Sequence, residues 1–146
     1  MNYIGSKLKL SSWIEEEVKK VVGDDLSQKI FCDIFAGTGI VGRTFKKNVK
    51  KVIANDLEDY SYVLNRNYIG NHEAIENKED FIEELNNLPL INTGFIYKNY
   101  CMGSGSQRQY FSDENGKKID TIRTQIENWK VSKKIDDDLY YFLLAS

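Results

Sequence analysis

The sequence predicts an α/β fold built around a parallel βαβ unit, and three observations lead to this prediction. An apolar run at 30–32, within a predicted strand at 29–34, leads into a glycine-rich loop, and a helix-like segment at 40–47 follows the loop. A second short predicted strand at 51–56, which ends in polar residues, comes one crossover later, as a parallel connection requires. A buried strand that passes through a glycine loop into a helix is typical of nucleotide-binding α/β folds.

The glycine loop is open to two classes of ligand. Its glycines, Gly37, Gly39 and Gly42, match the dinucleotide pattern G-x-G-x-x-G, and glycine permits a sharp turn and a close approach of backbone to ligand. The first amides of the following helix face such a ligand. Asp33, just before the loop, would repel a pyrophosphate and attract an ammonium or sulfonium. We therefore expect S-adenosylmethionine (SAM) rather than NAD; in the alternative interpretation, Asp33 only caps a turn or the helix start.

A second acid stands at the end of the second predicted strand. Asp56 follows Gly37 by 19 residues, the position at which an acid binds ribose hydroxyls in nucleotide-binding βαβ units. Glu58 is a neighbouring candidate. Asp56 could also cap the next predicted helix, 58–67, and the two roles are compatible.

The remaining elements follow from apolar periodicity and capping residues. Ser12 and Glu15 fit a capping box at the start of a helix over 12–22, and Asn77 is a possible cap for a second helix. The segment at 102–109 has the composition of a mobile linker. The other expected elements are a helix at 78–88, a possible short strand at 94–100, a helix at 117–130 and the start of a buried helix at 136–146.

Bulk properties describe one globular domain or part of one. The chain has 146 residues, a hydrophobic content of 41% and a net charge of −2, so overall charge neither predicts nor excludes nucleic acid. Cys32, expected to be buried, and Cys101 have no zinc-ligand spacing, and we predict no metal site. The N-terminus lacks the apolar stretch of a signal peptide, and the longest apolar run, 139–145, is too short to span a bilayer. A cytoplasmic location is the expectation.

Four lysines, Lys46, Lys47, Lys50 and Lys51, lie close together after the loop helix. Such a cluster could neutralise DNA phosphates. The alternative is a solvated helix end, where lysine is favoured by the helix dipole.

Three motifs together resemble a known family. The segment from Asn2 to Lys7 resembles a Y-x-G-x-K element, the segment from Asp33 to Gly39 resembles D-x-F-x-G-x-G, and Asn55-Asp56 resembles a second SAM motif. In this order and spacing they resemble the N-terminal part of the bacterial adenine-specific (N-6) DNA methyltransferases of the Dam-like group, which often belong to restriction–modification systems. The resemblance is strongest over 1–70.

This resemblance implies a Rossmann-like SAM-dependent methyltransferase fold, present here only in part, with SAM as cofactor and double-stranded DNA as partner. Residues 1–100 would form the SAM-binding part, and 101–146 a linker and helical segment that leads toward a target-recognition and catalytic part. Lys7 would meet the SAM carboxylate, Asp33 its ammonium and Asp56 its ribose. Phe35 would give an apolar wall, or alternatively pack beneath the loop. The implied cofactor residues are Tyr3, Gly5, Lys7, Asp33, Phe35, Gly37, Gly39 and Asp56.

The chain departs from the family at the catalytic box. The D-P-P-Y tetrapeptide is absent, because the single proline, Pro89, lies between two leucines. We therefore expect no catalytic residue here, and interpret the chain as an inactive fragment of a longer enzyme. The alternatives are a methyltransferase for another substrate, a NAD-binding oxidoreductase, or a non-catalytic fragment that binds SAM or a partner only. Self-association through the sheet edge and 139–145, or a complementing C-terminal chain, is also plausible.

Overall fold

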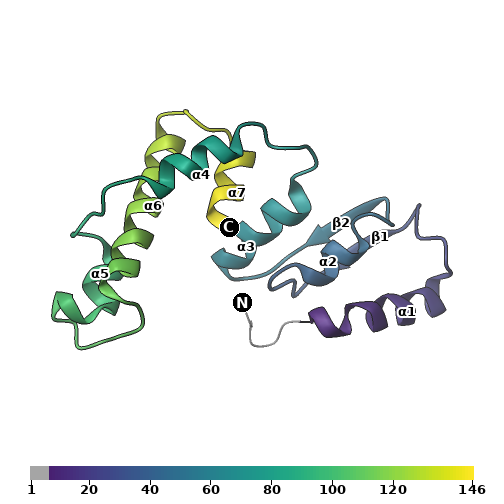
Figure 1. Ribbon diagram of the computed structural model, residues 1–146. Helices are drawn as coiled ribbons and strands as arrows, with labels where there is room; N and C mark the ends of the chain where they lie inside the picture. Colours follow the sequence, from purple (N-terminus) through teal and green to yellow (C-terminus); the bar gives the residue numbers. More distant parts are fainter. Residues whose placement is uncertain (1–6) are drawn as a thin grey trace. The chain divides into compact units, whose positions relative to one another are not determined.

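Two parallel strands form the sheet in the computed structural model, which describes residues 7–146 (Figure 1). The strands are β1 (Ile30–Asp33) and β2 (Lys51–Ala54), with Ile30 opposite Lys51 and Asp33 opposite Ala54. Helix α2 (Ile40–Phe45) lies between them in the chain. The predicted parallel βαβ unit is therefore confirmed, and the α/β class with it.

The chain divides into two compact units, and the first contains residues 7–73. Helix α1 (Ser11–Val22) and α2 enclose its core, in which Leu26, Val41 and Phe45 are buried. The rings of Phe31 and Phe45 stack with centroids 4.1 Å apart. Helix α3 (Asp59–Asn65) follows β2 and continues into a π-helical turn, Arg66–Gly70.

One face of the sheet remains open within residues 7–146. Phe31 and Val52 point to the packed face, whereas Ile30, Cys32 and Ile53 on the opposite face are exposed. The expectation of a buried Cys32 is therefore wrong, because successive strand residues alternate between faces and this thiol lies on the open one.

Helix α1 begins differently from the prediction. It is preceded by a 3-10 turn, Leu8–Leu10, and has no side-chain cap. Ser11 Oγ donates to Leu8 O at 2.8 Å, and Glu15 forms an ion pair with Lys19 at 2.7 Å. The capping box of Ser12 and Glu15 is thus wrong, since Glu15 is paired one turn further along.

The second unit, 74–144, is helical. Its helices are α4 (Lys78–Asn86), α5 (Phe95–Tyr100), α6 (Asp113–Val131) and α7 (Asp137–Ala145). Helices α4, α6 and α7, together with the segment between α6 and α7, form a core of Leu85, Ile126, Trp129, Ile135, Leu139 and Leu143. Ser112 caps α6 by accepting from Asn115 N, so this helix starts four residues earlier than predicted.

The predicted strand at 94–100 is wrong, because α5 occupies this segment. The buried Asp120 carboxylate of α6 accepts hydrogen bonds from the amides of Ile96 and Tyr97 at 3.0 and 2.8 Å. A carboxylate from a residue more than 20 positions away thus satisfies the free amides that open the helix.

The two units divide the chain near residue 73 by their internal packing, whereas the predicted division at residue 100 concerns function and stays a prediction. None of the helices within 7–146 is long and apolar enough to cross a bilayer.

Candidate functional site

The candidate site lies where the carboxyl ends of β1 and β2 meet. Hydrogen bonds continue past the strands, from Asn55 N to Asp33 O at 2.8 Å and from Ala36 N to Asn55 O at 3.0 Å. The loop after β1 and the segment after β2 are therefore joined by their backbones. In parallel α/β sheets this edge is where ligands bind.

Asp56 holds the glycine loop. Its Oδ2 accepts from Gly37 N at 2.8 Å, and its Oδ1 accepts from Glu58 N at 3.2 Å at the start of α3. The hydrogen bond from Gly37 is the largest cause that lowers the pKa of this carboxyl below its ordinary value, followed by the one from Glu58. Asp56 is thus ionised at neutral pH. A carboxylate has about four lone-pair positions, so hydroxyl donors can still be accepted.

Asp33 has one oxygen that no residue within 7–146 satisfies. Its Oδ1 accepts from Phe35 N at 3.3 Å, which fits the turn-capping interpretation. Its Oδ2 is buried and lacks a hydrogen-bond partner in this part of the chain. Leaving a buried polar atom without a partner is costly, and an ammonium at this point would relieve that cost.

Lys7 and Phe35 contact each other at the entrance to the loop. Lys7 Nζ donates to Phe35 O at 3.2 Å, so the lysine lies beside the loop. The Phe35 side chain is 75% exposed and does not pack beneath the loop, which removes the core-packing alternative. Tyr3 and Gly5 lie outside the described residues.

Two residues of α3 that the sequence analysis missed support the same loop. Ser61 Oγ and Asn65 Nδ2 donate to Gly37 O at 2.6 and 3.2 Å. Ser61 is completely buried, and Asn65 Oδ1 is buried with no hydrogen-bond partner within 7–146. The spacing of four residues on a helix after the second strand puts both on one face, and this spacing is the signal that could have found them.

The backbone conformation of the loop favours glycine at positions 37 and 39, and at position 39 there is also no room for a side chain. Gly37 and Gly39 have φ of +52° and +74°. A Cβ on Gly39 would lie 2.4 Å from Asn65 Oδ1, whereas one on Gly37 would meet nothing within 4 Å. Gly39 therefore allows α3 to approach the loop.

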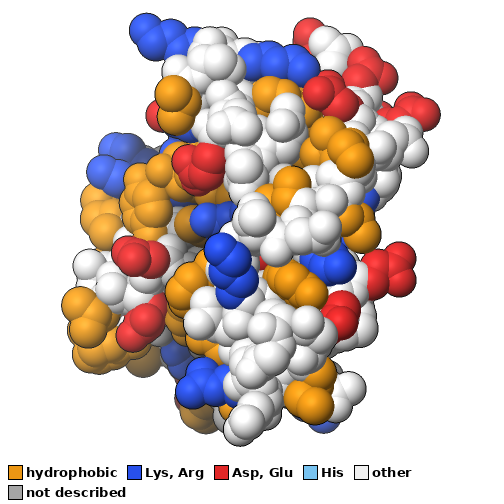
Figure 2. Space-filling view, turned by 90° about the vertical axis from the view of Figure 1, so that its left-hand side faces the viewer, with side chains coloured by type: hydrophobic (Ala, Val, Ile, Leu, Met, Phe, Trp, Pro, Cys, Tyr) orange, Lys and Arg blue, Asp and Glu red, His pale blue; other side chains and the backbone are white. Residues whose placement is uncertain are grey.

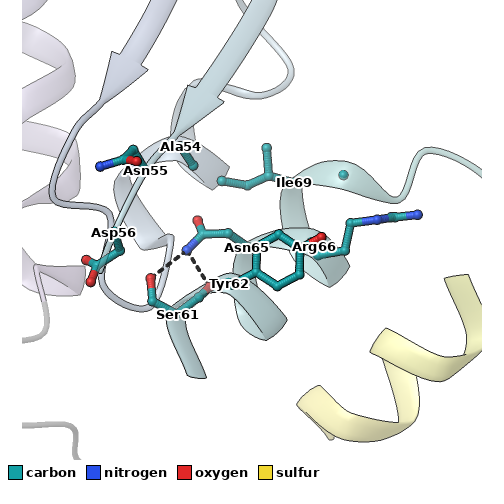
Figure 3. Close-up of a pocket in the computed structure, with 9 residues that line it drawn as sticks. Ala54, Asn55, Asp56, Ser61, Tyr62, Asn65, Arg66 and Ile69 are labelled. Carbon is teal, nitrogen blue, oxygen red and sulfur yellow. Dashed lines mark hydrogen bonds between the residues drawn. The ribbon is translucent and has the colours of Figure 1, made fainter. Parts of the chain in front are cut away.

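A cavity of about 260 Å³ opens between the end of β2 and α3 (Figure 3). The Asn65 amide lies at its wall and is directed at Ser61, where its nitrogen also donates to Ser61 O and Oγ at 2.8 and 3.1 Å. The cavity is lined by Ala54, Asn55, Asp56, Ser61, Tyr62, Asn65, Arg66, Ile69 and Gly70. It thus places apolar and polar groups beside the carboxylate of Asp56.

The predicted lysine cluster is divided. Lys46 Nζ donates to the carbonyls of Tyr68 and Asn71 at 3.1 and 2.5 Å, and burial lowers its pKa from the ordinary value. Lys47, Lys50 and Lys51 are exposed. Lys46 thus serves the first unit's own structure, and phosphate contact by the other three stays a prediction.

Fold and site together define an α/β protein with a parallel βαβ unit, in which one carboxylate ends β1 and another lies two residues after β2. The chain belongs to the D12 class N6 adenine-specific DNA methyltransferases, because that family's model matches residues 3–146. The family expected from the three motifs is therefore confirmed.

Three methyltransferases are similar to this chain over nearly its whole length. The type II methyltransferase M.NlaIII of Neisseria lactamica is 65% identical over 146 residues, which cover all of this chain and 43% of the relative. M.CviAII of Paramecium bursaria Chlorella virus 1 is 36% identical, again over all of this chain and 43% of the relative. M.FokI of Planomicrobium okeanokoites is 36% identical over 99% of this chain and 23% of the relative. The chain thus spans less than half of the length of these relatives. No solved structure matches it.

Proposed function

We propose that this chain is the SAM-binding portion of a DNA adenine methyltransferase, which moves the methyl group of SAM to the exocyclic amine of adenine in double-stranded DNA. The observation that carries the proposal is the buried Oδ2 of Asp33, which lacks a partner within 7–146 at the ligand-binding edge of the sheet. An ammonium-bearing ligand suits this oxygen, whereas the pyrophosphate of NAD does not. Membership of an adenine-specific DNA methyltransferase family supports the same conclusion.

Each site residue has a role in this proposal. Asp33 accepts hydrogen bonds from the SAM ammonium, and Asp56 accepts them from the ribose hydroxyls. Lys7, now hydrogen-bonded to Phe35 O, turns to the SAM carboxylate, and the exposed Phe35 ring forms an apolar wall. Tyr3 and Gly5 would lie at the methionine end, while Gly37 and Gly39 keep the loop free of side chains.

We further propose that β1 and β2 belong to a larger Rossmann-like sheet. Isolated two-stranded sheets are marginally stable, and Ile30 and Ile53 within these strands, together with Ile34 just after β1, are exposed. Additional strands and helices from the remainder of a full-length protein would cover them. Residues 1–100 would then serve the cofactor, and 101–146 would lead toward the recognition and catalytic parts. The complete enzyme would work in the cytoplasm.

Calorimetry with SAM, S-adenosylhomocysteine and NAD tests the cofactor. We expect the chain to bind the first two and not NAD. Because both share the ammonium, Asp33→Asn should weaken both by the same factor, about tenfold or more, the range for losing a charged hydrogen bond. Asp24→Asn, which neutralises an exposed acid in the same unit, is the control and should change neither affinity. NAD binding, or an unchanged SAM affinity of Asp33→Asn, would refute the proposal.

Methyl transfer to an adenine-containing duplex tests the activity. The chain alone should transfer none, because it lacks the D-P-P-Y box. Addition of the remaining segment of a relative such as M.NlaIII should restore transfer. Turnover by the pure chain would contradict the first expectation. SAM binding without restored transfer would favour a chain that only binds SAM or a partner.

A further inference from the structure

Exposed apolar side chains gather at one end of the second unit. They come from α5 and from the loop that joins it to α6. Tyr110 is 72% exposed and Phe95 67%, and Met102 and Phe111 are also exposed. Contiguous apolar exposure of this kind marks an interaction site more often than a solvated surface.

The aromatic rings form a connected series with an arginine beside its central ring. The Tyr100 ring contacts the rings of Phe95 and Tyr110 edge-on, at centroid distances of 6.1 and 5.7 Å. Arg108 Cζ lies 6.0 Å from the Tyr100 centroid. We call residues 100–111 the aromatic–arginine loop. Its flat rings and its guanidinium are thus presented together.

The loop is held in place by its own hydrogen bonds, although its composition predicts a mobile linker. Tyr110 N donates to Tyr100 O at 3.0 Å, and Ser106 Oγ donates to Cys101 O at 2.9 Å. Gly103 N donates to Asp113 Oδ1 at 2.9 Å, which anchors the loop to α6. A preorganised surface loses less conformational entropy when it binds a partner.

Charge around the loop favours an anionic partner. Arg108 and Lys98 are exposed, and Lys117 Nζ lies 4.6 Å from the centroid of the Tyr97 ring. Asp113, one of the two acids in the first turn of α6, accepts a hydrogen bond from Gly103 N. Figure 2 views the side of the molecule that carries α5 and α6, where basic side chains lie among hydrophobic and acidic ones.

We propose that the aromatic–arginine loop contacts duplex DNA, with Arg108 on a phosphate and Tyr110 stacked on a base that has left the helical stack. This inference rests on the proposed function, because an enzyme that methylates an adenine amine must take that base out of the duplex. Stacking on an aromatic ring tolerates any base, and a guanidinium suits a phosphate. Exposed rings and arginine on a preorganised loop provide both contacts.

Fluorescence anisotropy with a short labelled adenine-containing duplex tests the proposal. Arg108→Gln and Tyr110→Ala should each weaken binding by about fivefold or more, and Arg108→Gln should lower the salt slope by about one. Two matched variants should stay within about twofold of the parent: Tyr110→Phe, which keeps the ring, and Arg123→Gln, which removes an exposed arginine of α6. Thermal unfolding of each variant verifies that it is folded.

Three outcomes would overturn the inference: no duplex binding by the parent chain, equal losses in Arg108→Gln and Arg123→Gln, or parent-like binding by Tyr110→Ala. SAM calorimetry on the same proteins separates this inference from the proposed function. If the loop variants bind SAM normally and bind the duplex as tightly as the parent chain, the proposed role of the loop is refuted and the cofactor proposal is not. A parent chain that binds DNA through the loop but takes up no SAM would refute the cofactor proposal alone.

Discussion

The Asp56 carboxylate accepts a hydrogen bond from the Gly37 amide at 2.8 Å and so connects the end of β2 to the loop that follows β1. The two residues are 19 positions apart in the chain. This contact fixes the loop backbone at the edge of the sheet where the cofactor is proposed to bind.

Asp56→Asn should change the pH dependence of stability. The folded pKa of Asp56 lies below its ordinary value of 3.8, so its charged form stabilises the fold above that value. This contribution is lost as the pH falls through the folded pKa. Urea unfolding should therefore show a more stable parent at neutral pH and a difference that shrinks in acid. A difference that persists undiminished in strong acid would show that the charge is not its source.

Gly39→Ala should cost more stability than Gly105→Ala. Both glycines have nearly the same left-handed backbone, with φ of +74° and +84° and ψ of 10° and 8°. An alanine at either position carries about 1 kcal/mol of backbone strain. Only at Gly39 would the new Cβ also collide with Asn65 Oδ1. Chemical denaturation of the two variants measures this difference. Equal losses in the free energy of unfolding would show that Asn65 moves away from the new Cβ without cost.

Ser61→Ala should lower the free energy of unfolding by about 1 kcal/mol, because a fully buried hydroxyl loses its hydrogen bond to Gly37 O. Asn65 Nδ2 still donates to that carbonyl, so the acceptor keeps a partner. SAM affinity should fall as well, since the loop is less firmly held. Ser12→Ala, at an exposed position of α1, is the control and should change neither quantity. Parent-like stability of Ser61→Ala would contradict the role of α3 in holding the loop.

Asp120→Asn should destabilise the start of α5. The carboxylate accepts from two backbone amides, and bonds of this charged type stabilise a protein by about 2 kcal/mol each. Hydrogen exchange at the Ile96 and Tyr97 amides should accelerate. Asp80→Asn, at an exposed position of α4, should leave these amides unchanged. Unaltered exchange in Asp120→Asn would indicate that another group holds the helix start.

The two cysteines should react at very different rates with a thiol reagent. Cys32 is exposed on the open face of the sheet, whereas Cys101 is completely buried, and burial raises the pKa of its thiol above the ordinary value. The native chain should show one fast thiol, and Cys32→Ser should remove it. A second fast thiol in the native chain would mean that the α5–α6 contact opens readily.

Local sequence signals predicted the elements that depend on neighbouring residues. The run at 29–34, the glycine loop and the run at 51–56 predicted β1, α2 and β2 and their parallel pairing. Asp136, which accepts from Leu139 N, opens α7 where acids precede an apolar run. These signals are reliable because each arises within a few residues of the element it specifies.

Elements that depend on residues far away in the chain could not be predicted from the sequence. Residues 94–100 fold as a helix because Asp120 caps their first amides, and this contact crosses more than 20 residues. Ser61 and Asn65 join the site only after α3 packs on the glycine loop. The exposure of Cys32 likewise follows from which face of the sheet the helices cover.

The sequence by itself thus determined the βαβ unit, the carboxylates at or just after the ends of its two strands and the family to which the chain belongs. Only the tertiary structure decided which oxygen of Asp33 lacks a partner, which helix residues hold the loop and which ring lies beside Arg108. The physical reason is that covalent spacing sets local geometry, whereas burial and hydrogen-bond partners depend on chain segments that meet only after folding.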